Sequence, residues 1–177
     1  MHVVDRSIVY SGEITAELAC EFVAEMLKLQ KQQWPINIVC ASSIGGDPDA
    51  ALTMIDYIRN SPNHIDFYGS GALCSSQALI SLAADNVYLT SETAYLLFHK
   101  GEMSYEGNLQ NRGELNGFMK TAEALDFQNN FDCQWLSVNS CKPPNYWKER
   151  LEKDSEVYIF AEEALELELI DAIKHYS

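Results

Sequence analysis

The chain has 177 residues and a formal net charge of −14, and this acidic balance argues against nucleic acids and anionic membranes as partners, because both attract basic proteins. Hydrophobic residues make up 47% of the chain and charged residues 21%, which is typical of a globular protein and excludes disorder. No apolar run approaches the roughly 20 residues of a membrane helix, and no signal peptide is evident. We therefore expect a cytoplasmic protein with a single domain over residues 1–177.

The cysteines carry no metal-binding pattern. There are five of them, an odd number, and no two have the CxxC spacing or a histidine partner at the spacing of a zinc site. We expect reduced thiols in the core and no bound metal. The five residues are Cys20, Cys40, Cys74, Cys133 and Cys141.

The first half of the chain alternates strands and helices. Residues 7–10 form the first expected strand, which ends before Gly12, and Thr15 is the expected N-cap of an amphipathic helix that reaches residue 30. The apolar positions of that helix are Leu18, Phe22, Met26 and Leu29. The next expected elements are a strand at 36–40, a helix at 50–61, a strand at 65–71, a helix from Ser75, and strands at 86–90 and 94–99. This order predicts right-handed βαβ units and an α/β fold.

The second half is expected to be mainly helical. Apolar residues between 106 and 140 predict a long helix, and a single small core does not require that length. Two alternatives are open: part of its apolar face packs on another subunit, or the helix packs on its own sheet. The remaining expected elements are a short helix at 146–153, a strand at 156–160 and a closing helix at 161–173.

Candidate site residues lie in the loops that follow the parallel strands, where α/β folds place their sites. Ser75 starts a helix, where backbone N–H groups favour negative charge, so it is a candidate nucleophile; the alternative is that Ser75 or Ser76 is only an N-cap. Gly45 and Gly46 follow another strand and could supply the N–H donors of an oxyanion hole, or only a strand-to-helix turn.

A base and an acid are also present. His99 ends a buried strand and is placed for general-base chemistry, with a structural hydrogen-bonding role as the alternative. His64 lies in a polar turn, and the other two histidines lie near the termini. Asp154 and Glu156 precede the strand at 156–160 and could orient the imidazole, although either one, taken alone, also suits a surface charge.

The strands, helices and candidate site residues described above follow one another in the order that is typical of a known family, over nearly the whole chain. The segment SSIGGDPDAALTMIDYI is similar to the S-P-G-G segment of the proteolytic subunit of Clp-type serine proteases, with Ile44 in place of the proline. GALCSSQALISLAA resembles that family's G-x-A-A-S helix start, and SETAYLLFH resembles its histidine-bearing strand. VYIFAEEALELELIDAI is similar to its closing segment, with Glu168 at the position of the usual glycine, and Lys100 and Gly101 replace the family's Q-P after the histidine.

The resemblance implies a crotonase-like spiral of βαβ units with a protruding handle at about 106–152. By position it makes Ser75 the nucleophile and His99 its base. Glu156 stands where the family has its triad aspartate, with Asp154 as the alternative acid, and the backbone N–H groups of Gly46 and Ser76 form the oxyanion hole. No cofactor is implied.

The function implied is that of a serine endopeptidase that cleaves peptides or unfolded proteins inside a homo-oligomeric chamber of heptameric rings, commonly paired as a tetradecamer. The sequence opens close to the family's first strand, without its axial pore segment, so we expect action without a gating AAA+ unfoldase. Two alternatives are a non-catalytic ring subunit, which the glutamate at 156 favours, and a crotonase-fold enzyme that acts on acyl-CoA thioesters.

Overall fold

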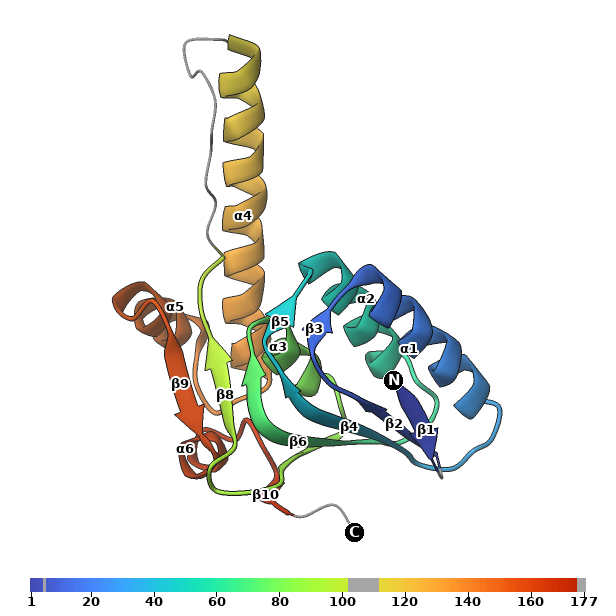
Figure 1. Ribbon diagram of the computed structural model, residues 1–177. Helices are drawn as coiled ribbons and strands as arrows, with labels where there is room; N and C mark the ends of the chain where they lie inside the picture. Colours follow the sequence, from blue (N-terminus) through green and yellow to red (C-terminus); the bar gives the residue numbers. More distant parts are fainter. Residues whose placement is uncertain (5, 102–111, 175–177) are drawn as a thin grey trace.

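The computed structural model describes residues 1–4, 6–101 and 112–174 (Figure 1). The strands are β1 (His2–Val4), β2 (Ser7–Tyr10), β3 (Glu13–Ile14), β4 (Ile36–Ser43), β5 (Gly45–Gly46), β6 (Ile65–Cys74), β7 (Asn86–Leu89), β8 (Tyr95–Phe98), β9 (Val157–Phe160) and β10 (Ala172–Ile173). The helices are α1 (Ala16–Leu29), α2 (Pro48–Arg59), α3 (Ser76–Ser81), α4 (Arg112–Val138), α5 (Pro144–Lys153) and α6 (Ala161–Glu166). This order agrees with the alternation predicted for the first half of the chain.

The main sheet is mostly parallel and is organised around β6. Its strand order is β1-β2-β4-β6-β7-β10. Among the strands of the described residues, β1 and β9 run antiparallel to their partners, β2 and β8, and the other pairs are parallel. The first half of β6 pairs with β7, and the second half, from Ala72 to Cys74, pairs with β8. The carboxyl end of β6 therefore lies beside β8, which in turn pairs with β9, and this is the end that leads into Ser75.

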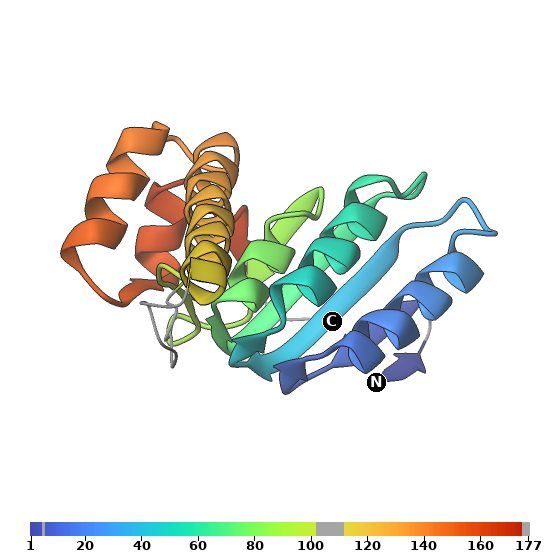
Figure 2. The same cartoon turned by 90° about the horizontal axis from the view of Figure 1, so that it is seen from above.

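Helices α1 and α2 cover one face of the sheet and lie side by side (Figure 2). The predicted cap of α1 is confirmed, because the Thr15 hydroxyl accepts a hydrogen bond of 3.2 Å from the Leu18 N–H. Phe22 and Met26 on α1 and Met54 on α2 are fully buried against the strands. The apolar stripe that predicted α1 is thus the stripe that packs on the sheet.

Helix α4 leaves the body of the molecule as a long rod (Figure 1). Its buried residues are Cys133 and Leu136, near its C-terminal end, where it packs against α3 and α5. Elsewhere on the helix, Met119 is 54% exposed and Phe127 is 73% exposed. Packing on its own domain therefore accounts only for the part of α4 from Leu125 onward. The part of the expected helix between 106 and 111 lies outside the described residues.

The closing segment corrects the sequence prediction of a helix over 161–173. Helix α6 ends at Glu166, and Glu168 adopts a left-handed backbone with a φ of 60°. The chain then turns, the Asp171 carboxylate accepts a 2.7 Å hydrogen bond from the Val87 N–H, and β10 pairs in parallel with β7. The segment after α6 is a buried turn followed by a short strand, and its apolar residues happen to continue the spacing of the helix. This is why the sequence predicted a longer helix.

The cysteines are free, as expected, but they are not all in the core. Cys40 and Cys133 are buried and Cys74 is partly buried, whereas Cys20 and Cys141 are exposed. The prediction of five core thiols is therefore wrong for the last two. Cys20 lies on the outward side of amphipathic α1, and Cys141 lies in the turn between α4 and α5.

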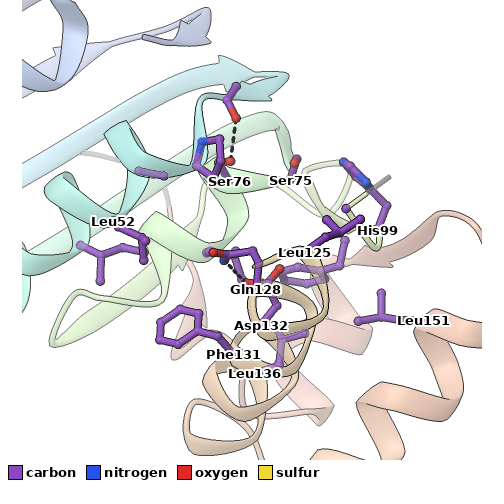
Figure 3. Close-up of a pocket in the computed structure, with 17 residues that line it drawn as sticks. Leu52, Ser75, Ser76, His99, Leu125, Gln128, Phe131, Asp132, Leu136 and Leu151 are labelled. Atoms are coloured by element: carbon purple, nitrogen blue, oxygen red, sulfur yellow. Dashed lines mark hydrogen bonds between the residues drawn. The ribbon is translucent and has the colours of Figure 1, made fainter. Parts of the chain in front are cut away.

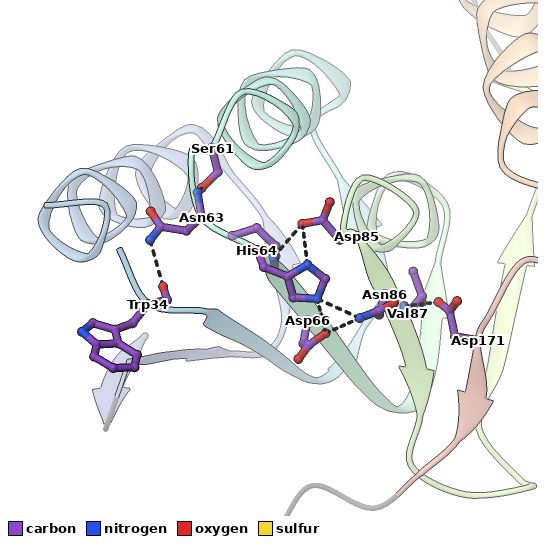
Figure 4. A network of polar contacts seen from close by, with 10 residues as sticks. Trp34, Ser61, Asn63, His64, Asp66, Asp85, Asn86, Val87 and Asp171 are labelled. Atoms are coloured by element: carbon purple, nitrogen blue, oxygen red, sulfur yellow. Dashed lines mark hydrogen bonds and ion pairs between the residues drawn. The ribbon is translucent and has the colours of Figure 1, made fainter. Parts of the chain in front are cut away.

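A polar cluster joins the amino ends of β6 and β7 (Figure 4). The His64 ring lies 3.2 Å from Asp66 and 3.6 Å from Asp85, and the Asn86 amide donates to Asp66 at 2.8 Å. Asp85 in turn accepts a 2.7 Å hydrogen bond from the Ile65 N–H. These bonds fix the register of the two strand starts. They lie at the opposite end of β6 from Ser75, so His64 has no part in the site described next.

Candidate active site

Ser75 occupies a strained turn between β6 and α3. Its φ of 55° and ψ of −128° are unusual for a residue other than glycine. The turn is held by its own backbone: the Ser75 N–H donates to the Leu97 carbonyl at 2.7 Å, and the Ser75 carbonyl accepts from the Ala78 N–H at 2.9 Å. Ser75 stands at the N-cap position, yet its side chain makes no capping hydrogen bond. Its hydroxyl thus lines a pocket without serving as a cap.

The two glycines bring a second backbone segment against this turn. A Cβ atom on Gly45 would lie 2.7 Å from the Cys74 carbonyl oxygen and 2.7 Å from the Ser75 Cβ, so only glycine fits there. A Cβ on Gly46 would collide with the Ile14 carbonyl oxygen, and its φ of 149° also favours glycine. The glycine pair therefore allows β5 to touch both β3 and the Ser75 turn.

Ser76 ties the same two segments together. Its buried hydroxyl donates to the Gly46 carbonyl at 3.0 Å. The Ser76 N–H is in the first turn of α3, where helical N–H groups have no partner within the helix. The Ile14 carbonyl accepts a hydrogen bond of 2.9 Å from the Asp47 N–H. Gly46 and Ser76, the residues named as oxyanion donors, line the same pocket as Ser75, and the role of their N–H groups stays a prediction.

His99 lines the same pocket as Ser75, one residue after β8 (Figure 3). Its Nδ1 lies 2.9 Å from the Lys100 carbonyl oxygen, and a carbonyl can only accept, so Nδ1 carries the proton. The lone pair of the neutral ring is then on Nε2, the atom a general base would use. Within the described part of the chain, no hydrogen bond joins His99 to Ser75.

The two acid candidates lie outside this pocket. The antiparallel pair Phe98–Val157 ends the ladder of β8 and β9, so Glu156 follows as the residue opposite His99. Glu156 is exposed, and its carboxylate accepts a 2.9 Å hydrogen bond from the Tyr158 hydroxyl. Asp154 is exposed at the C-cap of α5. Glu156 and His99 thus both adjoin the last pair of the β8–β9 ladder, but the imidazole bonds to Lys100 and not to either carboxylate.

Asp132 on α4 is a pocket residue that the sequence analysis missed. It lines the pocket with Ser75 and His99, and its carboxylate accepts a 2.8 Å hydrogen bond from the Gln128 amide (Figure 3). Burial raises the pKa of Asp132 to about 6, while the Gln128 hydrogen bond and His99 act in the opposite direction. A signal was available, because Asp132 stands in an apolar stripe between Leu125 and Leu136.

The burial of this carboxyl predicts a pH-dependent stability. The pKa of Asp132 is raised from 3.8 to about 6 on folding, so its contribution to stability is fully present below pH 3.8 and is lost as the pH rises through 6. The loss amounts to about 3 kcal/mol. Asp132→Asn should therefore be more stable than the wild type at pH 7.5, and the advantage should shrink towards pH 4. Urea unfolding at several pH values measures this, and a difference that does not change with pH would contradict it.

No group of three or more His, Cys, Asp or Glu side chains able to hold a metal ion occurs among the described residues. Within the same residues, no helix has the length and apolar character needed to cross a membrane.

Comparisons with known proteins agree with this architecture. The family model described as Clp protease matches residues 2–177. The ATP-dependent Clp protease proteolytic subunit 2 of Borreliella burgdorferi is 34% identical over 105 residues, which cover 58% of this chain and 52% of that protein. The alignment thus spans about half the length of that relative.

A solved structure of a ClpP1 mutant from Listeria monocytogenes superposes with a TM-score of 0.80 at 20% identity, covering 97% of this chain and 92% of that one. This likeness confirms the predicted crotonase-like α/β fold. Because the family model spans nearly all of the residues that build the sheet, the Ser75 turn and the handle helix, the chain belongs to the Clp protease family.

Proposed function

We propose that this chain is a serine-type endopeptidase that cleaves peptides or unfolded proteins through an acyl-enzyme on Ser75. Membership of the Clp protease family supports this class of activity. The observation that carries the proposal is the Ser75 turn. It holds a hydroxyl that makes no capping hydrogen bond on the wall of a pocket shared with His99. Strained strand-to-helix turns also expose nucleophilic serines in the unrelated α/β-hydrolase fold.

The proposed chemistry uses groups already near the pocket. The Ser75 Oγ bonds to the carbonyl carbon of the substrate while His99 Nε2 takes its proton, and the imidazolium then gives that proton to the departing amine. Water, deprotonated by His99, next releases the acyl group from Ser75. The N–H groups of Gly46 and Ser76 would stabilise the oxyanion, each by about 3–4 kcal/mol. His99 is exposed, so its ring can rotate towards Ser75 when substrate binds.

We assign the orienting acid to Glu156, with Asp154 as the alternative. Glu156→Ala should lower kcat by about 10³–10⁴-fold, because the imidazole loses the group that stabilises its charged form. Asp154→Ala is the matched control and should change kcat less than twofold. Tyr158→Phe removes the hydrogen bond that now holds Glu156 and should leave activity intact or raise it. A large loss for Asp154→Ala with none for Glu156→Ala would reverse the assignment.

We also propose a homo-oligomeric ring whose subunits enclose the sites in a chamber. The support is the α4 rod, which projects from the body of the protomer and carries the exposed side chains of Met119 and Phe127. A protomer of 20.0 kDa predicts sedimentation-velocity masses that correspond to seven or fourteen copies. A monomer at micromolar concentration would contradict this assembly.

A fluorophosphonate probe tests the proposed nucleophile. We expect one covalent adduct per chain in the wild type, mapped to Ser75 by peptide mass spectrometry, and none in Ser75→Ala. Equal labelling of both proteins would overturn the assignment of Ser75. A complete lack of labelling, together with normal assembly, would instead support a non-catalytic subunit. Turnover of acyl-CoA thioesters without peptide cleavage would support the third alternative.

A further inference from the structure

The pocket beside Ser75 continues between α2, α4 and α5 as a space of about 300 Å³. Its walls are mainly aliphatic and aromatic, and include Leu52, Ile55, Leu79, Leu125, Phe131 and Leu136. In a serine endopeptidase, the side chain on the acyl side of the scissile bond enters the pocket next to the nucleophile. The lining of this space therefore sets which residues can precede the cleaved bond.

Asp132 is the exception in this lining. Figure 3 shows its side chain with Gln128 on the α4 wall, while Ser75 and Ser76 belong to the β6–α3 wall. One carboxylate oxygen accepts from the Gln128 amide at 2.8 Å. Among the described residues, no Lys or Arg forms an ion pair with Asp132. His99 is the cationic group that lowers the pKa of Asp132, and only when its ring is protonated. A partly buried carboxylate without a permanent cation is costly, and a cationic side chain of the substrate would offset that cost.

The size and character of the pocket suit a long basic side chain. Lys and Arg pack their methylene stems on apolar surface and pair their charged heads with carboxylates. Here the stem would lie along leucine and phenylalanine side chains, and the head would reach Asp132. An uncharged side chain would fill the same walls but leave the carboxylate unpaired. The net charge of −14 also favours substrates with Lys or Arg, because it attracts cationic peptides.

We infer that Asp132 makes this pocket select Lys or Arg on the acyl side of the scissile bond. This inference rests on the proposed serine endopeptidase activity. It identifies Asp132 as a specificity-determining residue that touches the substrate side chain and takes no part in bond cleavage. The preference is thus separable from the nucleophile: a change at Asp132 should alter which bonds are cleaved while Ser75 remains reactive.

The test compares arginine with its neutral isostere citrulline in otherwise identical fluorogenic peptides. In the wild type, kcat/KM should be about 10–100-fold higher for arginine. Asp132→Asn should bring the ratio near one, and Asp132→Leu should also raise cleavage after leucine. Asp126→Asn is the matched control, because it removes the same charge from an exposed position of α4 and should keep the wild-type ratio. Fluorophosphonate labelling of each variant verifies that its site is folded.

The outcomes separate the two proposals. Cleavage that depends on Ser75 but shows no preference for arginine would overturn the inference and leave the proposed function standing. The same preference in Asp132→Asn would also overturn it. If the arginine-to-citrulline ratio falls as much in Asp126→Asn as in Asp132→Asn, the preference comes from the overall negative charge of the protein and not from Asp132 in the pocket, and the inference is overturned. If no Ser75-dependent cleavage occurs with any peptide, the proposed function fails, and the inference fails with it.

Discussion

Ser75→Ala should lower the kcat of peptide hydrolysis by about 10⁴–10⁶-fold. The reason is that the uncapped Ser75 hydroxyl is the proposed attacking group, and the neighbouring N–H donors cannot replace it. Stability should hardly change, because the structure of the turn rests on the backbone bonds to Leu97 and Ala78 and not on the hydroxyl. Initial rates on a fluorogenic peptide, with thermal unfolding measured in parallel, give both quantities.

Ser91→Ala is the matched control for this substitution. Ser91 lies in the turn between β7 and β8, where its hydroxyl lies 3.1 Å from the Thr93 hydroxyl and has no other hydrogen-bond partner among the described residues. Activity should therefore stay within twofold of the wild type. Wild-type activity in Ser75→Ala with an unchanged fold would contradict the mechanism, and an equal loss in both variants would show that the assay reports something other than the nucleophile.

The second large effect is expected at the glycine pair. Gly45→Ala places a methyl group 2.7 Å from both the Cys74 oxygen and the Ser75 Cβ, and Gly46→Ala drives a methyl group into the Ile14 carbonyl. Each change should force β5 away from the Ser75 turn. We expect at least a 10³-fold loss of kcat/KM, since the oxyanion donors move with β5, and a loss of about 2–4 kcal/mol in unfolding free energy.

Substitutions at two other glycines distinguish a steric clash from backbone strain as the cause of this loss. Gly117 lies in α4 with open space around it, so Gly117→Ala should keep activity and stabilise the helix by about 1 kcal/mol. Gly12 has a φ of 91° but no atom within 4 Å of an added Cβ, so Gly12→Ala should show backbone strain without a clash. Full activity in both Gly45→Ala and Gly46→Ala would mean that the close approach of β5 has no catalytic role.

Much of the fold could be predicted from local patterns. The Thr15 cap and the apolar stripe through Phe22 and Met26 predicted α1 because cap and stripe are local properties of the chain. The apolar run from Ile36 likewise predicted the strand that is observed as β4, which pairs in parallel with β2 and β6. The closing helix was predicted too long, because Glu168 turns the chain in a conformation that usually requires glycine. The spacing of apolar residues alone does not reveal such a turn when a buried segment follows it.

The candidate site could be predicted in part. Ser75, His99 and the glycine pair were named as candidates because each follows a strand, and the carboxyl ends of parallel strands lie at the same edge of a sheet. What the hydroxyl of Ser75 does there depends on its backbone angles and on contacts with β5, which are tertiary properties. Asp132 was missed because the face of α4 that lines the pocket is set by packing against α2, α3 and α5. The hydrogen bonds of His99 and Glu156 depend on rotamers, which sequence does not encode locally.

The most direct test of the central claim is a crystal structure of the protein after reaction with a peptide boronate that carries lysine or arginine next to the boron atom. The account predicts a covalent bond to the Ser75 Oγ, with one boronate oxygen about 2.7–3.1 Å from the Gly46 and Ser76 nitrogens. It also predicts His99 turned towards the adduct. A boronate bound elsewhere, or bound to Ser75 with its oxygens facing solvent and away from both N–H groups, would contradict the account.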